Sequence, residues 1–504
     1  MGSIAGLERF DSPGKGRALR VTRPFKVGEL LYSCPAYTYV LSLEERGYNC
    51  EFCFARKEKL ARCGKCKKAF YCNVKCQKED WAMHKLECSA MIAFKENWCP
   101  SEICRLVARI LAKKVGQLIK NNVWHIILFI IMPLFPQKTM KERCASENIL
   151  LIEEIQSHME DVDNEKREMH EADVARLHRF FSKHLEFPDH KDLLTLFAQV
   201  ACNGFTIEDD ELSNIGTAIY PDVALINHSC CPSVIVTNNG TSAEVRAVQN
   251  MKPGDEVLIS YIDVLFPTDD RNNRLRECYY FTCDCQDCNN MSKDKEKLKV
   301  RKQSDPIEPE VISNMVRYAR KTIGEFRAVK HTKTPSELLE MCEQSLEKMG
   351  AVFDDANVYM LHVMYQAMGV CLYMQDPDGT LRYGEKIIKH YRKLYPSYSL
   401  NVSSMFLKLG RLYMGLERRS AGVSALKKVT VFNMQRHSFG WYPKPRFNIP
   451  VTTNHGHTCM LYNAVQLFVY TGNGHNGGGL WEGSPLHDRV VQRDGIKMRS
   501  KVKK

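Results

Sequence analysis

Between residues 50 and 88 the chain carries seven cysteines and one histidine in closely spaced pairs. The pairs are Cys50-x2-Cys53, Cys63-x2-Cys66, Cys72-x3-Cys76 and His84-x3-Cys88. Zinc takes thiolate and imidazole ligands in fours, and such spacings let one turn present two ligands to one ion. Eight ligands therefore predict two closed structural zinc sites, and the first and third pairs can share one ion. The alternative is a set of scattered buried thiols. So short a segment lacks a core, so metal binding would supply most of its folding free energy.

A second group of cysteines is Cys283-x-Cys285-x2-Cys288. Three ligands need a fourth to close a tetrahedral zinc site. Cys230, in the sequence Asn227-His228-Ser229-Cys230, is the candidate, although it lies far away in the chain. This group predicts a third zinc ion.

The cysteine content has to be weighed against the start of the chain. There are 21 cysteines in 504 residues, and Met1–Gly6 contains no apolar signal region. We therefore expect metal or thiol chemistry rather than a disulfide framework. The formal net charge of +12 permits an acidic or nucleic-acid partner but does not require one. At about 150 residues per domain, the length predicts about three domains.

Hydrophobic patterns predict strands before residue 45, with the apolar run Leu30–Val40 broken at Pro35, and again over 200–261. Helical spacing begins near Ser101 and recurs from about Glu147 to Phe181. A charged stretch at Lys293–Lys302 is interpreted as a linker. Residues 308–428 are helical in pattern throughout. There Leu409-Gly410-Arg411-Leu412-Tyr413 fits part of a tetratricopeptide signature, and Met368–Tyr373 resembles it; a plain helical bundle is the alternative.

Three separated motifs carry a family resemblance: Gly14-Lys15-Gly16-Arg17, Asn227-His228-Ser229-Cys230, and Gly254-Asp255-Glu256-Val257-Leu258-Ile259-Ser260-Tyr261. Together they resemble a SET-domain lysine methyltransferase. The Cys/His segment 50–88 looks like a MYND zinc module inserted in that domain, an arrangement that resembles the SMYD family. The resemblance covers roughly residues 5–114 and 138–428.

The resemblance implies an α+β fold: a β-rich SET domain with an inserted MYND module, a post-SET zinc site and a C-terminal helical lobe similar to tetratricopeptide repeats. The implied segments are 5–49 and 201–264 for the SET domain, 50–88 for the MYND finger, 89–200 for a helical insert region, 265–290 for the post-SET region, and 308–428 for the helical domain.

The family implies S-adenosylmethionine as methyl donor, a protein lysine as acceptor, and three zinc ions. Gly14 and Gly16 would let the backbone approach the cofactor, and Lys15 or Arg17 would pair with its carboxylate. Cofactor contacts are implied for Lys15, Gly16, Arg17, His158, Cys202, Asn203, Ala224, Asn227, His228, Tyr279 and Phe281. Tyr261 matches the catalytic tyrosine, and Phe205, Tyr261 and Tyr279 are candidates for a substrate channel. Such a dry channel would lower the pKa of the lysine ammonium.

Three features depart from the family pattern. Val115–Gln137 is an apolar insert too short for a membrane span, and 429–504 is an atypical tail that we expect to be disordered. Both segments follow a Lys-Lys pair and begin with valine, whose codons start with the donor dinucleotide of an intron. We interpret them as translated introns; genuine isoform sequence is the alternative. Gln156 stands where the family resemblance predicts Glu.

The expected function is lysine methylation on histones and non-histone proteins, with a role in transcription, in cytoplasm and nucleus. The alternative is a non-catalytic adaptor that binds proline-rich or chaperone peptides through its MYND and helical modules. The intact motifs Gly14–Arg17, Asn227–Cys230 and Tyr261 favour catalysis. We expect a monomer with no membrane segment and no sequence-specific nucleic-acid binding.

Overall fold

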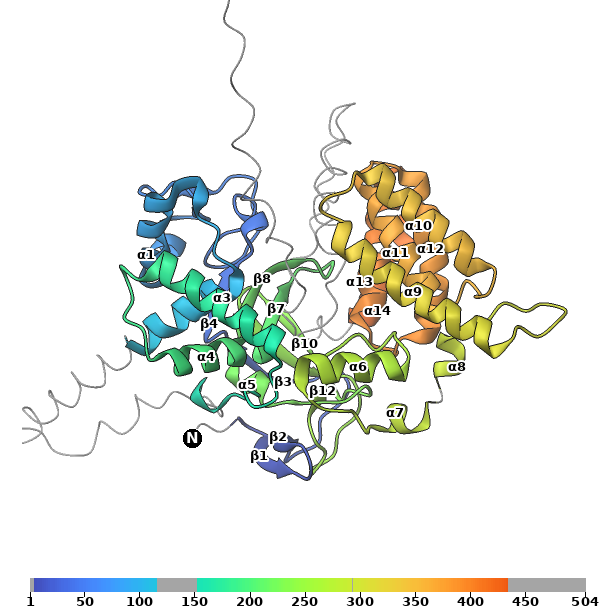
Figure 1. Ribbon diagram of the computed structural model, residues 1–504, viewed down its shortest axis with the longest axis horizontal. Helices are drawn as coiled ribbons and strands as arrows, with labels where there is room; N and C mark the ends of the chain where they lie inside the picture. The colour runs from blue at the N-terminus through green and yellow to red at the C-terminus, as the bar shows by residue number, and fades with distance from the viewer. Residues whose placement is uncertain (1–3, 116–151, 292, 434–504) are drawn as a thin grey trace, which may run out of the picture.

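The computed structural model describes residues 4–115, 152–291 and 293–433. A β-rich N-terminal body, residues 4–115 and 152–262, lies beside a helical lobe, residues 309–433 (Figure 1). Residues 263–308 connect the two along one side. Most of the insert at 115–137 and most of the tail at 429–504 lie outside the described residues.

Two three-stranded antiparallel sheets form the centre of the N-terminal body, in the orders β10-β11-β3 and β4-β8-β7. The break predicted at Pro35 is where the chain passes from one sheet to the other. The strands are β3 (Leu30–Pro35), β4 (Thr38–Leu41), β7 (Gly204–Glu208), β8 (Asn214–Ile219), β10 (Val234–Asn239) and β11 (Ser242–Ala247).

Three short strand pairs complete the sheet structure. An antiparallel hairpin joins β1 (Leu7–Ser12) to β2 (Gly16–Val21), and a second joins β5 (Ala61–Arg62) to β6 (Phe70–Tyr71). A parallel pair joins β9 (Asn227–His228) to β12 (Leu258–Ile259). The alternating pattern over 256–261 thus forms a strand of only two residues.

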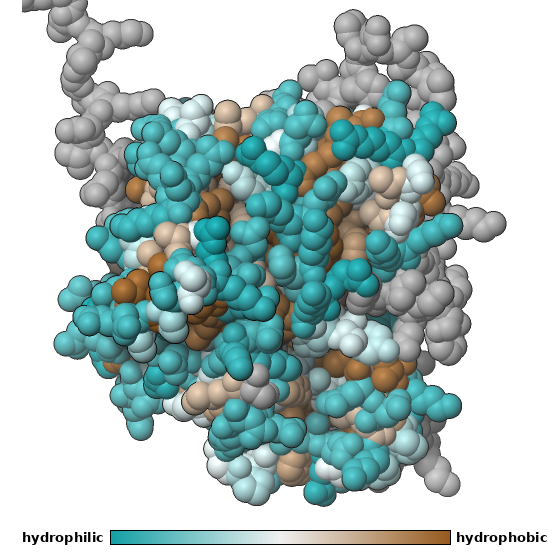
Figure 2. Space-filling view, turned by 90° about the vertical axis from the view of Figure 1, so that its right-hand side faces the viewer, coloured by the Kyte–Doolittle hydropathy of each residue, from teal (hydrophilic) through white to brown (hydrophobic). Residues whose placement is uncertain are grey.

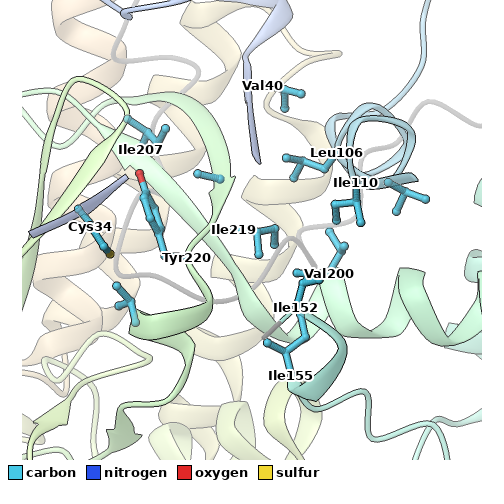
Figure 3. Packing of buried hydrophobic residues seen from close by; sticks show 14 of the residues in the cluster. Cys34, Val40, Leu106, Ile110, Ile152, Ile155, Val200, Ile207, Ile219 and Tyr220 are labelled. Atoms are coloured by element: carbon cyan, nitrogen blue, oxygen red, sulfur yellow. The ribbon is translucent and has the colours of Figure 1, made fainter. Parts of the chain in front are cut away.

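Helices cover these sheets. They are α1 (Val74–Phe94), a helix over 102–115, α3 (Asn164–Phe181), α4 (His190–Asn203) and α5 (Pro221–Ala224), with 3-10 turns η1 (Leu43–Glu45), η2 (Lys95–Asn97) and η4 (Ile152–Glu154). Figure 3 shows Leu106 and Ile110 packed near Ile219 and Val200, so that helix and sheet share one core.

The helix expected from Glu147 to Phe181 is not continuous. Its described part consists of the single turn η4 and then α3, which begins only at Asn164. The carboxylate of Asp163 accepts a hydrogen bond from the backbone N–H of Lys166 and so caps α3 at this point. The intervening loop contains His158, one of the residues implied for the cofactor.

The charged stretch at 293–302 is not a free linker. After α6 (Thr268–Tyr279) and α7 (Gln286–Asn290), it forms α8 (Asp294–Lys297), and Val300 pairs with Phe353 of the helical lobe. Lys297 is buried, and its Nζ donates hydrogen bonds to the backbone oxygens of Val264 at 2.8 Å and Phe266 at 3.0 Å. Because the stretch is rich in charged residues, its sequence did not predict that it packs against the rest of the protein.

The helical lobe contains α9 (Pro309–Val329), α10 (Pro335–Gly350), α11 (Val358–Tyr373), α12 (Pro377–Leu394), α13 (Leu400–Gly415) and α14 (Arg419–Asn433). From α10 to α14, helices that follow one another in the chain pack together, as helix-pair repeats do. α11 is buried on nearly every side and forms the centre. Hydrophilic side chains dominate the outer face (Figure 2).

The helical pattern does not stop at residue 428, because α14 continues to Asn433 and Val429 packs against the core of the lobe. Within the described residues, no helix is both long enough and apolar enough to span a membrane.

Candidate cofactor and metal sites

The finger, residues 50–88, gathers its eight predicted ligands into two groups. One contains Cys50, Cys53, Cys72 and Cys76, and the other contains Cys63, Cys66, His84 and Cys88; in each group the ligand atoms all lie within 4.8 Å of one another. The pairs therefore interleave, as their order along the chain allowed. The Sγ atoms of Cys53 and Cys72 are 3.6 Å apart, and those of Cys63 and Cys88 are 3.9 Å apart. Tetrahedral zinc with bonds of 2.3 Å places its sulfurs about 3.8 Å apart, so the geometry fits zinc.

Local structure explains this gathering. Asn73 caps α1 by accepting a hydrogen bond from the backbone N–H of Cys76 at 3.0 Å, which fixes Cys76 in the first turn. His84 and Cys88 lie one turn apart on the same face of α1. The hairpin β5–β6 turns the segment of Cys63 and Cys66 back toward that face. The spacing of His84 and Cys88 therefore follows from one turn of α1, and that of Cys63 and Cys66 follows from the hairpin β5–β6.

The third group contains Cys230, Cys283, Cys285 and Cys288, again within 4.8 Å of one another, so the distant ligand proposed from the sequence is in place. The guanidinium of the buried Arg271, on α6, donates from Nε to Cys230 Sγ at 3.2 Å and from Nη2 to Cys288 Sγ at 3.5 Å. Four thiolates and one zinc ion carry a net charge of −2, which Arg271 partly offsets. The cysteine spacing gave no sign of this arginine.

The Gly14–Arg17 motif forms the turn between β1 and β2. Gly14 has φ +73° and Gly16 φ +74°, and a Cβ built on either would meet no atom within 4 Å. Glycine adopts such a backbone readily, and the turn leaves room for a ligand against the main chain. Lys15 and Arg17 add two cations. Burial, and then the charge of Arg9, lowers the pKa of Arg17 from its ordinary value.

The second and third motifs are joined by the parallel pair β9–β12, in which Asn227 lies opposite Leu258 and His228 opposite Ile259. Just beyond it, the backbone N–H of Tyr261 donates to Nδ1 of His228 at 2.9 Å. The hydroxyl of Tyr261 donates to the backbone oxygen of Ile226 at 2.7 Å. These bonds place Tyr261 directly against the Asn227-His228 segment.

His228 is held as a neutral imidazole. Its Nδ1 accepts from Tyr261, so its proton resides on Nε2, which lies 3.4 Å from Cys230 Sγ. Burial lowers the pKa of His228 to about 3. The ring thus links the third zinc group to Tyr261.

Aromatic rings surround Tyr261. The centroid of its ring lies 4.9 Å from that of Tyr279, 5.2 Å from that of His228 and 6.3 Å from that of Phe281. The hydroxyl of Tyr279 donates to the backbone oxygen of Tyr261 at 3.4 Å. Burial, followed by the nearby charge of Glu256, raises the pKa of Tyr261. Three aromatic rings thus pack around Tyr261, and its place in a substrate channel stays a prediction.

Three further predicted residues lie together near the C-terminal end of α6. The side-chain amide of Asn203 donates to the backbone oxygen of Gln156 at 2.8 Å, and the thiol of Cys202 lies 3.9 Å from the backbone oxygen of Cys278. His158 stacks on Tyr280 with ring centroids 5.3 Å apart. The position where Glu was expected, Gln156, is therefore in this group, and it uses its backbone to hold Asn203.

The last two predicted residues are Ala224, on α5, and Phe205, on β7. Ala224 is the final residue of α5, two residues before the oxygen that accepts the Tyr261 hydroxyl. Phe205, on β7, packs its ring edge-on against Tyr220 with centroids 5.8 Å apart. The role of Phe205 in a channel stays a prediction.

Glu256 was not singled out from the sequence, although it lies within the third motif. Its carboxylate accepts from Asn227 Nδ2 at 3.0 Å and from the hydroxyl of Ser12 at 3.1 Å, and it lies 3.9 Å from Lys15 Nζ. One side chain therefore connects all three motifs.

Comparison with known proteins agrees with this geometry. Residues 50–88 match the MYND finger family. The chain is 63% identical to the N-lysine methyltransferase SMYD2 of Homo sapiens over 425 residues, which covers 84% of this chain and 93% of the relative. N-lysine methyltransferase SMYD2-A of Xenopus laevis is 61% identical over 437 residues, covering 87% of this chain and 96% of the relative. The chain belongs to the SMYD family.

A solved structure, the SET domain of LSMT bound to lysine and AdoHcy, aligns over 91% of this chain and 94% of that chain at 9% identity. Its TM-score of 0.29 is too low to support an argument. Membership of the SMYD family confirms the combination of SET domain, MYND finger and helical lobe.

Proposed function

We propose that this protein is a protein-lysine N-methyltransferase that uses S-adenosylmethionine. The observation that carries the proposal is the convergence of three sequence motifs, where Tyr261 is hydrogen-bonded to His228 and Asn227 is joined to the Gly14–Arg17 turn through Glu256. Relatives that match this chain over most of its length are named N-lysine methyltransferases.

The cofactor site is open at the turn and positively charged. Gly14 and Gly16 leave space for the cofactor against the backbone, and Lys15 and Arg17 would bind its carboxylate. When bound, S-adenosylmethionine supplies a methyl group on a cationic sulfur. Asn203, Asn227 and Phe281 are proposed to hold its remaining groups.

Tyr261 would position the substrate amine. Its hydroxyl proton is used in the bond to Ile226, so its oxygen is left as an acceptor for an N–H of lysine. The surrounding rings of Tyr279 and Phe281 exclude water, and desolvation lowers the pKa of the lysine ammonium so that a neutral amine is available. Held by Tyr261, such an amine would be placed to accept the methyl group that the bound cofactor supplies, with the extra proton of the methylated ammonium passing to solvent.

All three metal groups are closed sets of four ligands, so zinc there would be structural. We further propose histone and non-histone proteins as substrates, a role in transcription, location in cytoplasm and nucleus, a monomeric state and no sequence-specific nucleic-acid binding. These proposals rest on the family resemblance.

A second candidate function is that of an adaptor. Val74 and Trp81, on α1 of the finger, are 64% and 36% exposed, and Lys65 lies 5.2 Å from the ring of Trp81. An exposed aromatic ring and an apolar neighbour favour contact with a peptide, such as a proline-rich one. Binding of chaperone peptides by the helical lobe is proposed on the family resemblance alone.

The two functions are separated by methyl transfer. Purified protein is incubated with labelled S-adenosylmethionine and histones, as wild type and as Tyr261→Phe. We expect transfer by the wild type and a loss of about 100-fold or more in the variant, because the positioning oxygen is removed. Cofactor binding, measured by calorimetry, should persist in both. No transfer by the wild type, together with retained binding of proline-rich peptide, would favour the adaptor.

A further inference from the structure

Glu256 occupies an unusual place in the cofactor site. Its Oε1 accepts from Asn227 Nδ2 at 3.0 Å, and its Oε2 accepts from the hydroxyl of Ser12 at 3.1 Å. Ser12 ends β1 and is buried, and only 18% of the Glu256 side chain is exposed. The backbone is fixed too, since the hydroxyl of Ser233 donates to the backbone oxygen of Glu256.

A carboxylate can only accept hydrogen bonds, and this decides how Asn227 is oriented. The amide of asparagine has a donor side, Nδ2, and an acceptor side, Oδ1. Because Glu256 accepts, Nδ2 must face it, and Oδ1 is left as the atom that can accept from a ligand. S-adenosylmethionine offers donors in its ammonium group and in the amine of its adenine ring.

Glu256 also lies near one charged group, Lys15, but this contact is weaker. Lys15 Nζ lies 3.9 Å from Oε2, and the side chain of Lys15 is 35% exposed. Exposed ion pairs at this separation contribute little to stability. The bonds to Asn227 and Ser12 are therefore the ones that define the role of Glu256.

We propose that Glu256 is a positioning residue for the cofactor: it fixes the side-chain amide of Asn227 in a single orientation and ties that residue to the Gly14–Arg17 turn through Ser12. This inference rests on the proposed function and deepens it. Glu256 acts through Asn227 and is not itself a catalytic residue.

The test uses Glu256→Gln in the full chain, with Glu244→Gln as a matched control. Gln keeps the size of the side chain but offers both a donor and an acceptor, so the amide of Asn227 can turn over. Glu244 is buried to the same extent, 17% exposed, and it also accepts hydrogen bonds, from Arg246 and Asn239 on its own sheet.

Binding of S-adenosylhomocysteine is measured by titration calorimetry. We expect affinity about tenfold lower for Glu256→Gln and unchanged for Glu244→Gln. In steady-state kinetics KM for S-adenosylmethionine should rise by a similar factor, while kcat and KM for the peptide stay close to wild type. That split between parameters is not expected of a residue that only stabilises the fold.

A rescue completes the experiment. Asn227→Asp alone sets two carboxylates against each other and should lose affinity strongly. Combining it with Glu256→Gln exchanges donor and acceptor between the two positions, so the double variant should bind more tightly than Asn227→Asp. Rescue of affinity by the exchange supports the proposal even where Glu256→Gln alone folds poorly.

The outcomes separate the two proposals. Wild type that binds no S-adenosylhomocysteine overturns both the proposed function and this inference. Wild type that binds, with Glu256→Gln binding equally well, overturns the inference alone. Equal losses in Glu256→Gln and Glu244→Gln, or a double variant that folds but binds no better than Asn227→Asp, also overturn it.

Discussion

The finger and the helical lobe are attached to the rest of the molecule in different ways. The finger shares one hydrophobic core with the N-terminal body, because Cys63, Tyr71 and Cys88 pack in the same cluster as strands β3, β8 and β11. The helical lobe has a core of its own. Although both are predicted as modules from sequence, only the lobe is a separate packing unit.

Buried charges strengthen the attachment of the finger. Glu87, on α1, receives hydrogen bonds from Arg105 Nε at 2.8 Å and Arg109 Nη2 at 3.2 Å, and all three side chains are at most 2% exposed. The two arginines also donate to the backbone oxygens of Leu41 and Tyr39 on β4. Burial alone would raise the pKa of Glu87, but the charges of Arg105 and Arg109 lower it.

The helical lobe meets the N-terminal body and the connecting segment through polar contacts in which Tyr395, Tyr359 and Ser404 are buried, and Leu265 of the connecting segment packs in the core of the lobe. The hydroxyl of Tyr395 donates to both carboxylate oxygens of Asp263, at 2.9 and 3.0 Å, and Tyr359 donates to Asp270 at 2.8 Å. On the other side, the hydroxyl of Ser404 donates to the backbone oxygen of Glu211, whose carboxylate pairs with Arg411. The lobe and the N-terminal body are thus joined by polar contacts between two separate hydrophobic cores, whereas the finger shares the core of the body.

Among the variants considered, loss of zinc from the finger should have the largest effect on the stability of the N-terminal body. Cys63→Ala removes one ligand, and we expect the N-terminal body to lose more than about 5 kcal/mol of stability, because metal binding supplies folding free energy. Hydrogen exchange should accelerate in β7 and β8 while α11 stays protected. The control is Cys99→Ala, which changes an exposed cysteine outside the three ligand groups. Unchanged exchange in β7 and β8 would make the finger an independent module.

Glu87→Gln should have the second-largest effect on stability. The change leaves Arg105 and Arg109 with less compensating charge in a buried site, which costs about 3 kcal/mol or more. Urea unfolding followed by fluorescence measures the free energy of unfolding. Glu79→Gln, on the exposed side of the same helix, is the control and should change it by less than about 0.5 kcal/mol. Similar values for the two variants would show that the buried charges do not secure the finger.

Tyr395→Phe tests the attachment of the lobe and should have a smaller effect. It removes the hydroxyl that donates to Asp263, at a cost of about 1–2 kcal/mol. We expect faster proteolysis in the connecting segment 263–308, with the melting of the N-terminal body unaltered. Tyr398→Phe, at a residue 40% exposed, serves as the control. A drop in the stability of the body itself would contradict a separable lobe.

The last prediction is a pH dependence at the β7–β8 turn, which faces the lobe. Burial, and then the charge of Asp209, raises the pKa of Glu208 to about 8. The folded protein keeps this proton up to about pH 8, whereas the unfolded chain releases it near the ordinary value of 4.5. The folded state therefore binds more protons in this window, and stability falls as the pH rises through it. Thermal melts of Glu208→Gln should show a flatter dependence between these pH values; an identical slope would refute the assignment.

The parts predictable from sequence are those set by local spacing. Each ligand pair of the finger is closely spaced in the chain, so the spacing alone identified them. Cys230 and Tyr261 were found because short motifs mark them, although their neighbours are distant in the chain. The cofactor contacts predicted for His158, Cys202 and Asn203 rest only on the family resemblance, since nothing in the local sequence around them indicates a cofactor contact.

What sequence missed depends on tertiary contact. Lys297 lies in a charged stretch typical of a linker, yet two backbone oxygens more than thirty residues away bury it. Nothing in the local sequence distinguishes Arg271 or Glu256 from other charged residues. Only the fold places Arg271 beside two thiols and Glu256 beside Asn227. The loop before α3 interrupts an apparently helical pattern because Asp163 offers a cap.

The interleaved ligands of the finger determine when, during synthesis on the ribosome, each metal ion can be enclosed. Neither ion can be fully enclosed while only the first half of the segment has been synthesised, because Cys76 completes one set and Cys88 the other. Strands β7 and β8, against which the finger's neighbours pack, emerge more than a hundred residues later. A nascent chain would thus hold its metal ions before the sheet that will support them exists.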